Sequence, residues 1–247
     1  MKKFFDPSPP VLTPHDIVTA LTGRKEKELL LPKRAIITFA AGDLNFVVRQ
    51  KKGVLIDAWS PFKQFYRLDD TNTIITRSFI GGPAIAALVE ELTAFGIEEL
   101  IMWGYCGALN EELLVGDVIT AVGALREDGV SHHYPGEDPV VQSNWLEEWL
   151  PPARSQSFHE GVIWSCDAIY RETVSKVSQY RDMGIKAVEM EAASFYAVSR
   201  YKNVKGIAFL VVSDLLSGDK WVGGFGTKAF KAGARKLSQF ILERAIV

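Results

Sequence analysis

Apolar residues along the chain occur in two patterns, short continuous runs and stretches where they recur every three or four positions. The short runs predict buried strands, and the three-to-four spacing predicts helices with one face against a core. Strands are expected at 34–39, 54–58, 73–77, 99–103, 117–125, 161–164, 186–188 and 206–212. Helices are expected at 13–23, 83–95, 140–150, from 191 onward and at 228–246. This alternation is typical of an α/β fold.

Several connecting segments carry expectations of their own. Residues 40–43 are expected to form a tight loop, and residues 44–52 fit either a short helix or a strand. The 140–150 helix is expected on the surface, ended by the prolines at 151 and 152. Residues 215–226 contain four glycines and predict a flexible loop that could act as a lid. Four aromatic residues between the second and third strands are expected in the core or in a subunit interface: Trp59, Phe62, Phe65 and Tyr66.

Composition and net charge argue against a nucleic-acid-binding, a membrane-spanning or a secreted protein. The chain has 247 residues, a formal net charge of −2 and 23% charged residues, so no overall field favours nucleic acid or a membrane surface. No window is long and apolar enough for a membrane span or a signal peptide, which makes a cytoplasmic protein the expectation. We expect one domain over 1–247, with 1–33 as an N-terminal extension that carries a short helix. Cys106 and Cys166 lack metal-ligand spacing and are expected to be small buried residues.

One stretch organises the rest, the sequence Val-Glu-Met-Glu-Ala-Ala that begins at Val188. An apolar strand ends here and a helical pattern starts at once, so Glu189 and Glu191 lie at a strand-to-helix corner. Ligands gather at such corners in α/β folds. Carboxylates near a helix N-terminus also stabilise the helix dipole, so both readings remain open from the residues alone.

The stretch resembles the sugar-binding signature of the nucleoside phosphorylase superfamily, which includes related nucleosidases. The resemblance implies that Glu191 binds the ribose hydroxyls, that Met190 packs on the sugar, and that Glu189 belongs to the same site. The chemistry suits these roles, because a carboxylate accepts charge-assisted hydrogen bonds from vicinal hydroxyls. A thioether can cover an apolar sugar face without competing for those hydroxyls.

Three further segments resemble the loops that hold phosphate, or water in the nucleosidases. They are expected to supply Gly42, Asp43, Gly81, Gly82, Tyr105, Cys106 and Gly107. The three positions where the phosphorylases of the family carry arginine hold Phe46, Trp59 and Met102 here. A dianion needs paired positive charge or many N–H donors to leave water. The substitutions therefore favour water as the nucleophile, with Asp43 positioning it, unless Arg49, Lys63, Arg67, Arg77 or a neighbouring subunit supplies the charge.

The base-binding segments are the last to show the resemblance. Ser213 and Asp214 end an apolar strand, where purine-cleaving members have an Asp that bonds or protonates the leaving base. A turn or helix cap is the structural alternative for Asp214. Ile169 and Tyr170 fall in the segment that stacks on the base, and Phe195 is a substitute for that role. His132 and His133 lie in a loop that we expect to be structural or ligand-adjacent, without metal, because adjacent side chains diverge.

Taken together, the resemblance implies a three-layer α/β/α phosphorylase/hydrolase-like fold with a mixed central sheet. The expected activity is cleavage of a nucleoside N-glycosidic bond, purine favoured, with Asp214 and Glu191 as catalytic residues and hydrolysis preferred. A phosphate-dependent purine or uridine phosphorylase is the first alternative, and a non-catalytic nucleoside-binding relative is the second. We expect no cofactor and no metal, with phosphate only as a co-substrate. A homo-oligomer (dimer, trimer or hexamer) is expected, without nucleic-acid or membrane partners.

Overall fold

The computed structural model describes residues 4–68, 71–217 and 220–245. Its helices are α1 (Pro14–Thr22), α2 (Ala41–Gln50), α3 (Gly82–Ala94), α4 (Leu146–Ser155), α5 (Val174–Asp182), α6 (Ala192–Tyr201) and α7 (Lys228–Ala245). The first strands are β1 (Arg34–Thr38), β2 (Val54–Ser60), β3 (Lys63–Arg67), β4 (Thr73–Arg77), β5 (Glu99–Ala108) and β6 (Val118–Glu127). The others are β7 (Val140–Gln142), β8 (His159–Cys166), β9 (Ala187–Glu189), β10 (Lys205–Leu215) and β11 (Val222–Gly223).

All the strands belong to one mixed sheet, ordered β11-β10-β6-β8-β9-β5-β1-β4-β3-β2, with β7 beside β6. Strand β5 also pairs with β10, so β5, β10, β6, β8 and β9 close on themselves as a small barrel. The remaining strands extend from β5 as an open wing. Parallel β5 and β10 end together, and β9 joins the end of β5 to the end of β8. These strand ends form one rim of the barrel.

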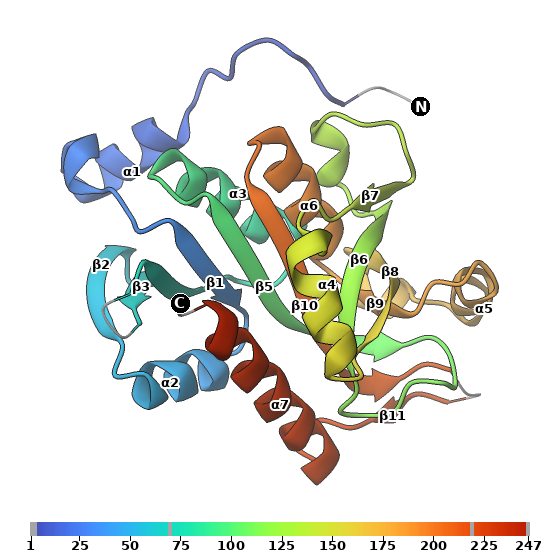
Figure 1. Ribbon diagram of the computed structural model, residues 1–247. Coiled ribbons are helices and arrows are strands. Elements are labelled where there is room, and N and C mark those ends of the chain that lie inside the picture. Colours follow the sequence, from blue (N-terminus) through green and yellow to red (C-terminus); the bar gives the residue numbers. More distant parts are fainter. Residues whose placement is uncertain (1–3, 69–70, 218–219, 246–247) are drawn as a thin grey trace.

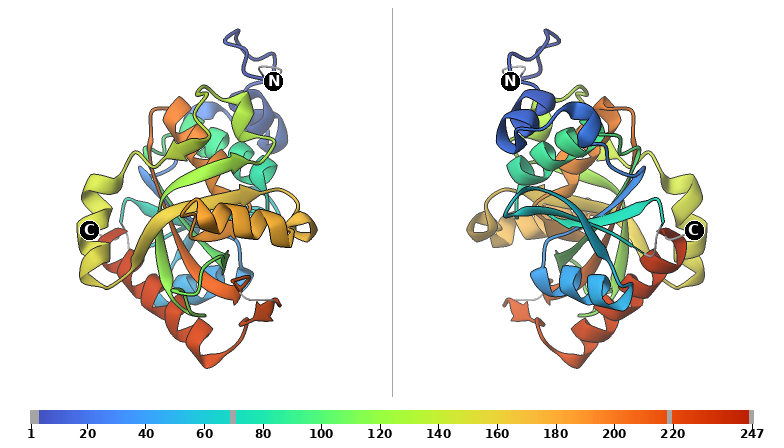
Figure 2. Two further views of the ribbon diagram at one scale, coloured as in Figure 1. Left: turned by 90° about the vertical axis from the view of Figure 1, so that its right-hand side faces the viewer. Right: turned by 90° about the vertical axis from the view of Figure 1, so that its left-hand side faces the viewer.

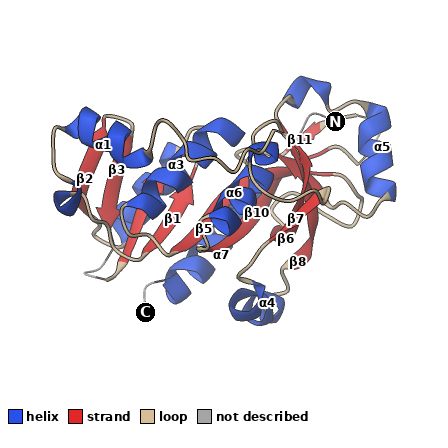
Figure 3. Cartoon of the chain, turned by 90° about the horizontal axis from the view of Figure 1, so that it is seen from above, coloured by secondary structure: helices blue, strands red, loops and turns tan. Residues whose placement is uncertain are grey.

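Helices cover both faces of this sheet (Figures 1 and 3). One core lies under α1, α3 and α6, and a second lies under α2, α4 and α7. Helix α5 covers a third apolar cluster around Trp164 and Val188, on the outside of β8 and β9. The expected three-layer α/β/α class with a mixed sheet is therefore confirmed, and the closure of its central strands is added to it.

The N-terminal segment folds as its capping residues predict. The Thr13 side chain accepts from the backbone of Asp16, Pro14 opens α1, and Gly23 follows its end with a positive φ of 67°. Helix α1 packs on α3, where His15 Nε2 lies 3.1 Å from the Ala94 carbonyl oxygen. Figure 2 shows α1 and α3 together at the top of the molecule, opposite α7 at the bottom. The single domain with an extension over 1–33 stays a prediction.

Two loop predictions were wrong. Helix α2 starts at Ala41, so the expected tight loop over 40–43 is its first turn, and the ambiguous segment after it is helical. Strand β11 lies within the predicted loop 215–226 and pairs with β10, Asp214 opposite Gly223. Residues 218–219 of that loop lie outside the described residues. A strand such as β11 forms because it pairs with another strand, and the glycine content of the segment itself does not predict that pairing.

Two further elements also differ from the prediction. The aromatic cluster contains an unpredicted strand, β3, in which Phe65 is buried and packs edge-on against the buried Trp59 at 4.5 Å. The expected 140–150 surface helix is instead β7 followed by α4, and α4 continues through both prolines. Trp149 of α4 is buried against Phe209 and Phe240, and this packing outweighs the proline penalty. No helix within the described ranges is both long and apolar enough to cross a membrane.

Candidate active site

The predicted site residues converge on the rim of the barrel. Gly107 of β5 is the register partner of both Asp214 and Val188, and Ser165 of β8 is opposite Glu189. Gly107 has no room for a side chain, because a Cβ there would lie 3.0 Å from Asp214 Oδ2 and 2.3 Å from Leu216. The close approach of β5 to β10 therefore requires glycine and places Asp214 over the rim.

Glu189 has the helix-capping role that one of the two readings gave it. Its Oε2 accepts from the backbone N–H of Glu191 at 2.7 Å and of Ala192 at 2.8 Å, at the start of α6. The Ser165 hydroxyl donates to Glu189 Oε1 at 2.5 Å and accepts from the Ala193 N–H at 2.9 Å. Both carboxylate oxygens are thus bonded within the protein, so Glu189 fixes the backbone from which Glu191 extends.

Glu191 points across the rim toward another segment. Its Oε1 accepts from the backbone N–H of Gly81 at 2.5 Å, which joins the start of α6 to the start of α3. Gly81 has a φ of 103°, and a Cβ at Gly82 would lie 2.7 Å from the Ser194 hydroxyl, so both glycines permit this close approach. Burial raises the pKa of Glu191 and of Glu189, and the charge of Glu191 raises that of Glu189 further. Met190 lies between them, partly exposed at the rim.

Asp214 is oriented by two donors. The Ser213 hydroxyl donates to its Oδ1 at 2.6 Å, and the indole N–H of Trp221 donates to its Oδ2 at 2.8 Å. The Trp221 ring covers Gly223, where a Cβ would meet the ring at 2.6 Å. The β10–β11 hairpin therefore holds an aromatic donor on the acid, and sequence reasoning did not find Trp221.

The expected base-stacking residues differ in exposure. Ile169 and Tyr170 lie in a short 3₁₀ turn (Ile169–Arg171) with 54% and 93% of their surfaces exposed, so both are available to a ligand. Phe195 is fully buried in the α6 core and cannot stack on a base. The histidine-containing loop is structural, because Asp128 is buried in it and accepts from Ser131 and from the Ser194 hydroxyl of α6.

The predicted phosphate or water loops are organised around an acid–phenol pair. Tyr105 OH donates to Asp43 Oδ2, and the Tyr105 ring packs edge-on against Phe230 of α7. Burial raises the pKa of Asp43. The hydroxyl position of the family motif is therefore occupied by a phenol that is already bonded to a carboxylate. Gly42 lies exposed beside this pair, and Cys106, on the next position of β5, is buried like Cys166.

Two of the three positions that lack arginine are buried in an apolar core, and the third lies on a helix surface. Trp59 and Met102 are buried in the core under α1, α3 and α6, and Phe46 is 38% exposed on α2. Of the four basic residues that could substitute, Lys63 is paired with Glu91 at 2.5 Å and Arg49 donates to its own helix at the Asn45 carbonyl. No group of three or more His, Cys, Asp or Glu side chains suited to a metal ion occurs in the described part of the chain.

Glu172 is a second residue that the sequence did not single out. It follows the 3₁₀ turn, and burial together with the nearby charge of Asp214 raises its pKa from 4.5 to about 7. A raised folded-state pKa means that the native state loses stability as pH rises from the unfolded value toward about 7. Glu172→Gln is therefore expected to raise the melting temperature at pH 8 and to leave it nearly unchanged at pH 4. Thermal unfolding at both pH values checks this, and an equal shift at the two would contradict it.

Comparison with known proteins agrees with this geometry. A family model described as "Phosphorylase superfamily" matches residues 33–246. A guanosine phosphorylase of Halorubrum lacusprofundi is 36% identical over 157 residues, which span 62% of this chain and 65% of that protein. A DeoD-type purine nucleoside phosphorylase of Bacillus cytotoxicus is 31% identical over 141 residues, 55% of this chain and 60% of that protein. The matches thus span less than two thirds of either relative.

Solved structures share the fold. The chain matches a uridine phosphorylase of Vibrio fischeri with a TM-score of 0.75 and 21% identity, covering 87% of this chain and 92% of that one. It matches a purine nucleoside phosphorylase of Toxoplasma gondii with a TM-score of 0.77 and 17% identity, covering 90% and 93%. Sequence identities this low establish a shared fold and do not establish a shared activity. Since the family model covers nearly the whole chain, this protein belongs to the phosphorylase superfamily.

Proposed function

We propose that this protein hydrolyses the N-glycosidic bond of a purine nucleoside. The observation that carries the proposal is that the residues at the family's three arginine positions supply no positive charge. Trp59 and Met102 are buried in the apolar core, and Phe46 lies on α2. A phosphate dianion needs paired positive charge or many N–H donors to leave water, whereas a water nucleophile needs neither.

The residues divide the reaction between the sugar and the base. Glu191 would accept from the ribose hydroxyls and favour the cationic sugar, with Met190 against the ring. Asp214, held by Ser213 and Trp221, would take up a proton from solvent and deliver it to the base as the bond to C1′ breaks. Water then bonds to C1′ and passes a proton to the Asp43 carboxylate, which returns it to solvent, so nucleoside and water give free ribose and free base. Asp43 is our candidate for positioning that water, since its raised pKa makes it a better base.

The preference for purines rests on Asp214 and on the relatives. The most similar curated proteins reported above are named guanosine and purine nucleoside phosphorylases. Ile169 and Tyr170 would cover the base from the 3₁₀ turn, where both are exposed. The same names favour a second candidate function, phosphate-dependent phosphorolysis at this rim.

A product assay separates the two functions. The protein is incubated with guanosine in phosphate-free buffer and again with phosphate, and the sugar product is identified. We expect free ribose, formed at the same rate in both. Ribose 1-phosphate that appears only with phosphate would contradict hydrolysis and establish the second candidate. Binding of guanosine without release of base in either buffer would contradict both and indicate a non-catalytic nucleoside-binding protein.

Other properties follow from the proposal. Hydrolysis by water and carboxylates needs no organic cofactor and no metal ion, and phosphate enters only in the second candidate. We also propose a homo-oligomer, because β2 is the last strand of the sheet and exposes Val54 and Leu55. A nucleoside substrate and a cytoplasmic location complete the proposal.

A further inference from the structure

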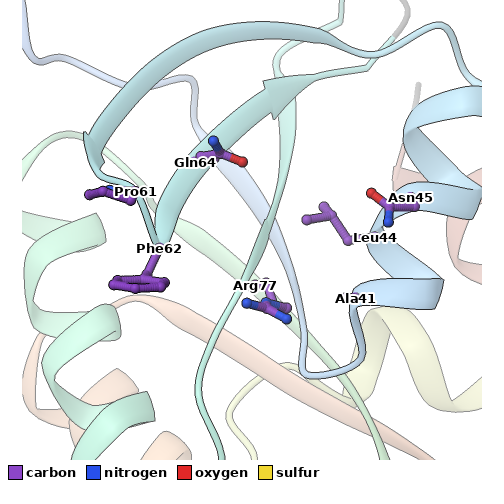
Figure 4. Close-up of a pocket in the computed structure, with 7 residues that line it drawn as sticks. All are labelled: Ala41, Leu44, Asn45, Pro61, Phe62, Gln64 and Arg77. Atoms are coloured by element: carbon purple, nitrogen blue, oxygen red, sulfur yellow. The ribbon is translucent and has the colours of Figure 1, made fainter.

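One cavity of the protein lies between α2 and the β2–β3 hairpin. Figure 4 shows Arg77 in its middle, with Leu44 and Asn45 of α2 on one side. Leu44 and Asn45 follow Gly42 and Asp43 in α2, so this cavity adjoins the predicted phosphate or water loop. It therefore belongs to the candidate active site.

A larger cavity, of about 500 Å³, lies between β7 and the second half of α6, which are neighbours in Figure 1. Its lining includes Ala197, Arg200 and Tyr201 of α6, and none of the rim carboxylates. Glu191 immediately precedes α6 at the rim. At a rise of 1.5 Å per residue, the three lining residues are about 9–15 Å along the helix axis from Glu191. This cavity is therefore separate from the candidate active site.

One wall of the larger cavity is a loop that a buried arginine holds in place. Arg126 Nη1 donates to the Gly136 carbonyl at 2.7 Å, and its Nε donates to the Ser131 hydroxyl at 3.1 Å. Burial lowers the pKa of Arg126, and the charges of Asp128 and Asp138 raise it. Because these guanidinium donors are used within the protein, Arg126 fixes the wall, and Asp138 lies on that wall.

Two opposite charges remain for a ligand. Arg200 and Asp138 are both exposed and both line the cavity. Within the part of the chain that the structure describes, neither side chain forms a hydrogen bond or an ion pair, and the two do not pair with each other. A molecule that carries a carboxylate and an ammonium group can satisfy both at once.

Strand β7 adds apolar side chains and a free strand edge to this lining. It pairs with β6 alone among the described strands. The ladder bonds run from the Arg126 N–H to the Pro139 carbonyl at 2.8 Å and from the Ser143 N–H to the Val122 carbonyl at 3.0 Å. Bonded pairs alternate in an antiparallel ladder, so the cavity-lining residues Val140 and Gln142 direct their backbone N–H and C=O groups away from β6. An unpaired edge of this kind is a template for an extended peptide.

From these features we propose that the cavity binds a small zwitterion with an apolar body, an α-amino acid or a short peptide. Its carboxylate would bond to the planar fork of Arg200 and its ammonium group to Asp138. Its apolar part would pack on Val140, Val141 and Ala197. The volume lies within the range of about 300–1,000 Å³ that is usual for small-molecule pockets. In a peptide, the amide group would also pair with the free edge of β7.

Calorimetric titration of the full chain with L-leucyl-L-leucine tests the site, together with the N-acetylated dipeptide and the dipeptide amide. We expect saturable binding of the free dipeptide, weakened about fivefold by either blocking group, the upper end of what an exposed ion pair contributes. Arg200→Gln should bind the free dipeptide and its amide equally. Asp138→Asn should bind the free dipeptide and its N-acetylated form equally.

Arg235→Gln is the matched control, because it removes an exposed charge of α7 outside the cavity, and its affinity should stay within about twofold of the parent. L-leucine identifies the source: equal affinity for L-leucine and the dipeptide indicates an amino acid, and tighter binding of the dipeptide indicates a peptide on the edge of β7. Absence of saturable binding of both, or binding that Arg200→Gln and Asp138→Asn leave unchanged, would overturn the site. Guanosine cleavage should be the same in both variants and the parent, because neither residue lies at the rim.

Discussion

Asp214→Asn is expected to lower kcat for release of a purine base by about 10²–10⁴-fold, the range that a positioned general acid contributes. The amide keeps the size of the side chain and can still bond to Ser213, but it cannot deliver a proton. The loss should therefore fall on kcat much more than on substrate affinity. Steady-state release of guanine from guanosine, with an independent measurement of nucleoside binding, checks both parts.

Trp221→Phe is the matched control for this prediction. It keeps an aromatic ring over Gly223 and removes only the N–H that donates to Asp214 at 2.8 Å. We expect a smaller loss of kcat than for Asp214→Asn, together with a shifted pH profile, because the acid loses a donor that orients it. Near-normal turnover by Asp214→Asn would exclude Asp214 as the proton donor and would favour a structural role for it in a turn.

The centre of the site could be predicted because it is local in the sequence. The change from apolar run to helical spacing at Val188 predicts a strand-to-helix corner, and the structure places β9 and α6 there. The residues left both roles open for the two carboxylates. The structure separates them: Glu189 caps α6, whereas Glu191 crosses to Gly81. The roles of the two carboxylates differ because the start of α3 lies within reach of Glu191. The sequence around Val188 contains no sign of where α3 packs.

The partners of the acids could not be predicted, for the same reason. Ser165 reaches Glu189 because β8 pairs with β9, and Trp221 reaches Asp214 because β11 folds back on β10. Neither pairing leaves a periodic signal, since β9 and β11 have only three and two residues. The prediction that the prolines end the helix near residue 150 was wrong for a related reason. Prolines are strong local signals against a helix, but the burial of Trp149 stabilises α4, which continues through both prolines.

The carboxylates of the candidate site lie in two groups. Glu189, Glu191 and Asp214 lie at the barrel rim, and Asp43 and Tyr105 bond to each other where the family motif carries a hydroxyl. Carboxylates beside C1′ favour a sugar that becomes cationic. Phosphorolysis would in addition require paired positive charge for the phosphate, and the three arginine positions of the family hold Phe46, Trp59 and Met102.

Glu191→Gln is expected to reduce the preference for a riboside over the matching 2′-deoxyriboside by about tenfold or more. A hydrogen bond between a charged group and a hydroxyl contributes about 1.5–3 kcal/mol, and Glu191 is only 7% exposed, so water screens it little. The glutamine can still accept from the Gly81 N–H, so the loop should keep its position. The ratio of kcat/KM for guanosine and 2′-deoxyguanosine, in variant and parent, measures the effect.

Glu189→Gln supplies the control for the same assay. Both Glu189 oxygens bond within the protein, three of its contacts lying between 2.5 and 2.8 Å, so its loss should weaken the start of α6. We expect a lower melting temperature for Glu189→Gln with the riboside preference retained. An unchanged preference in Glu191→Gln would remove Glu191 from the sugar site. A preference lost equally in both variants would mean that the position of α6, rather than the Glu191 charge, selects the sugar.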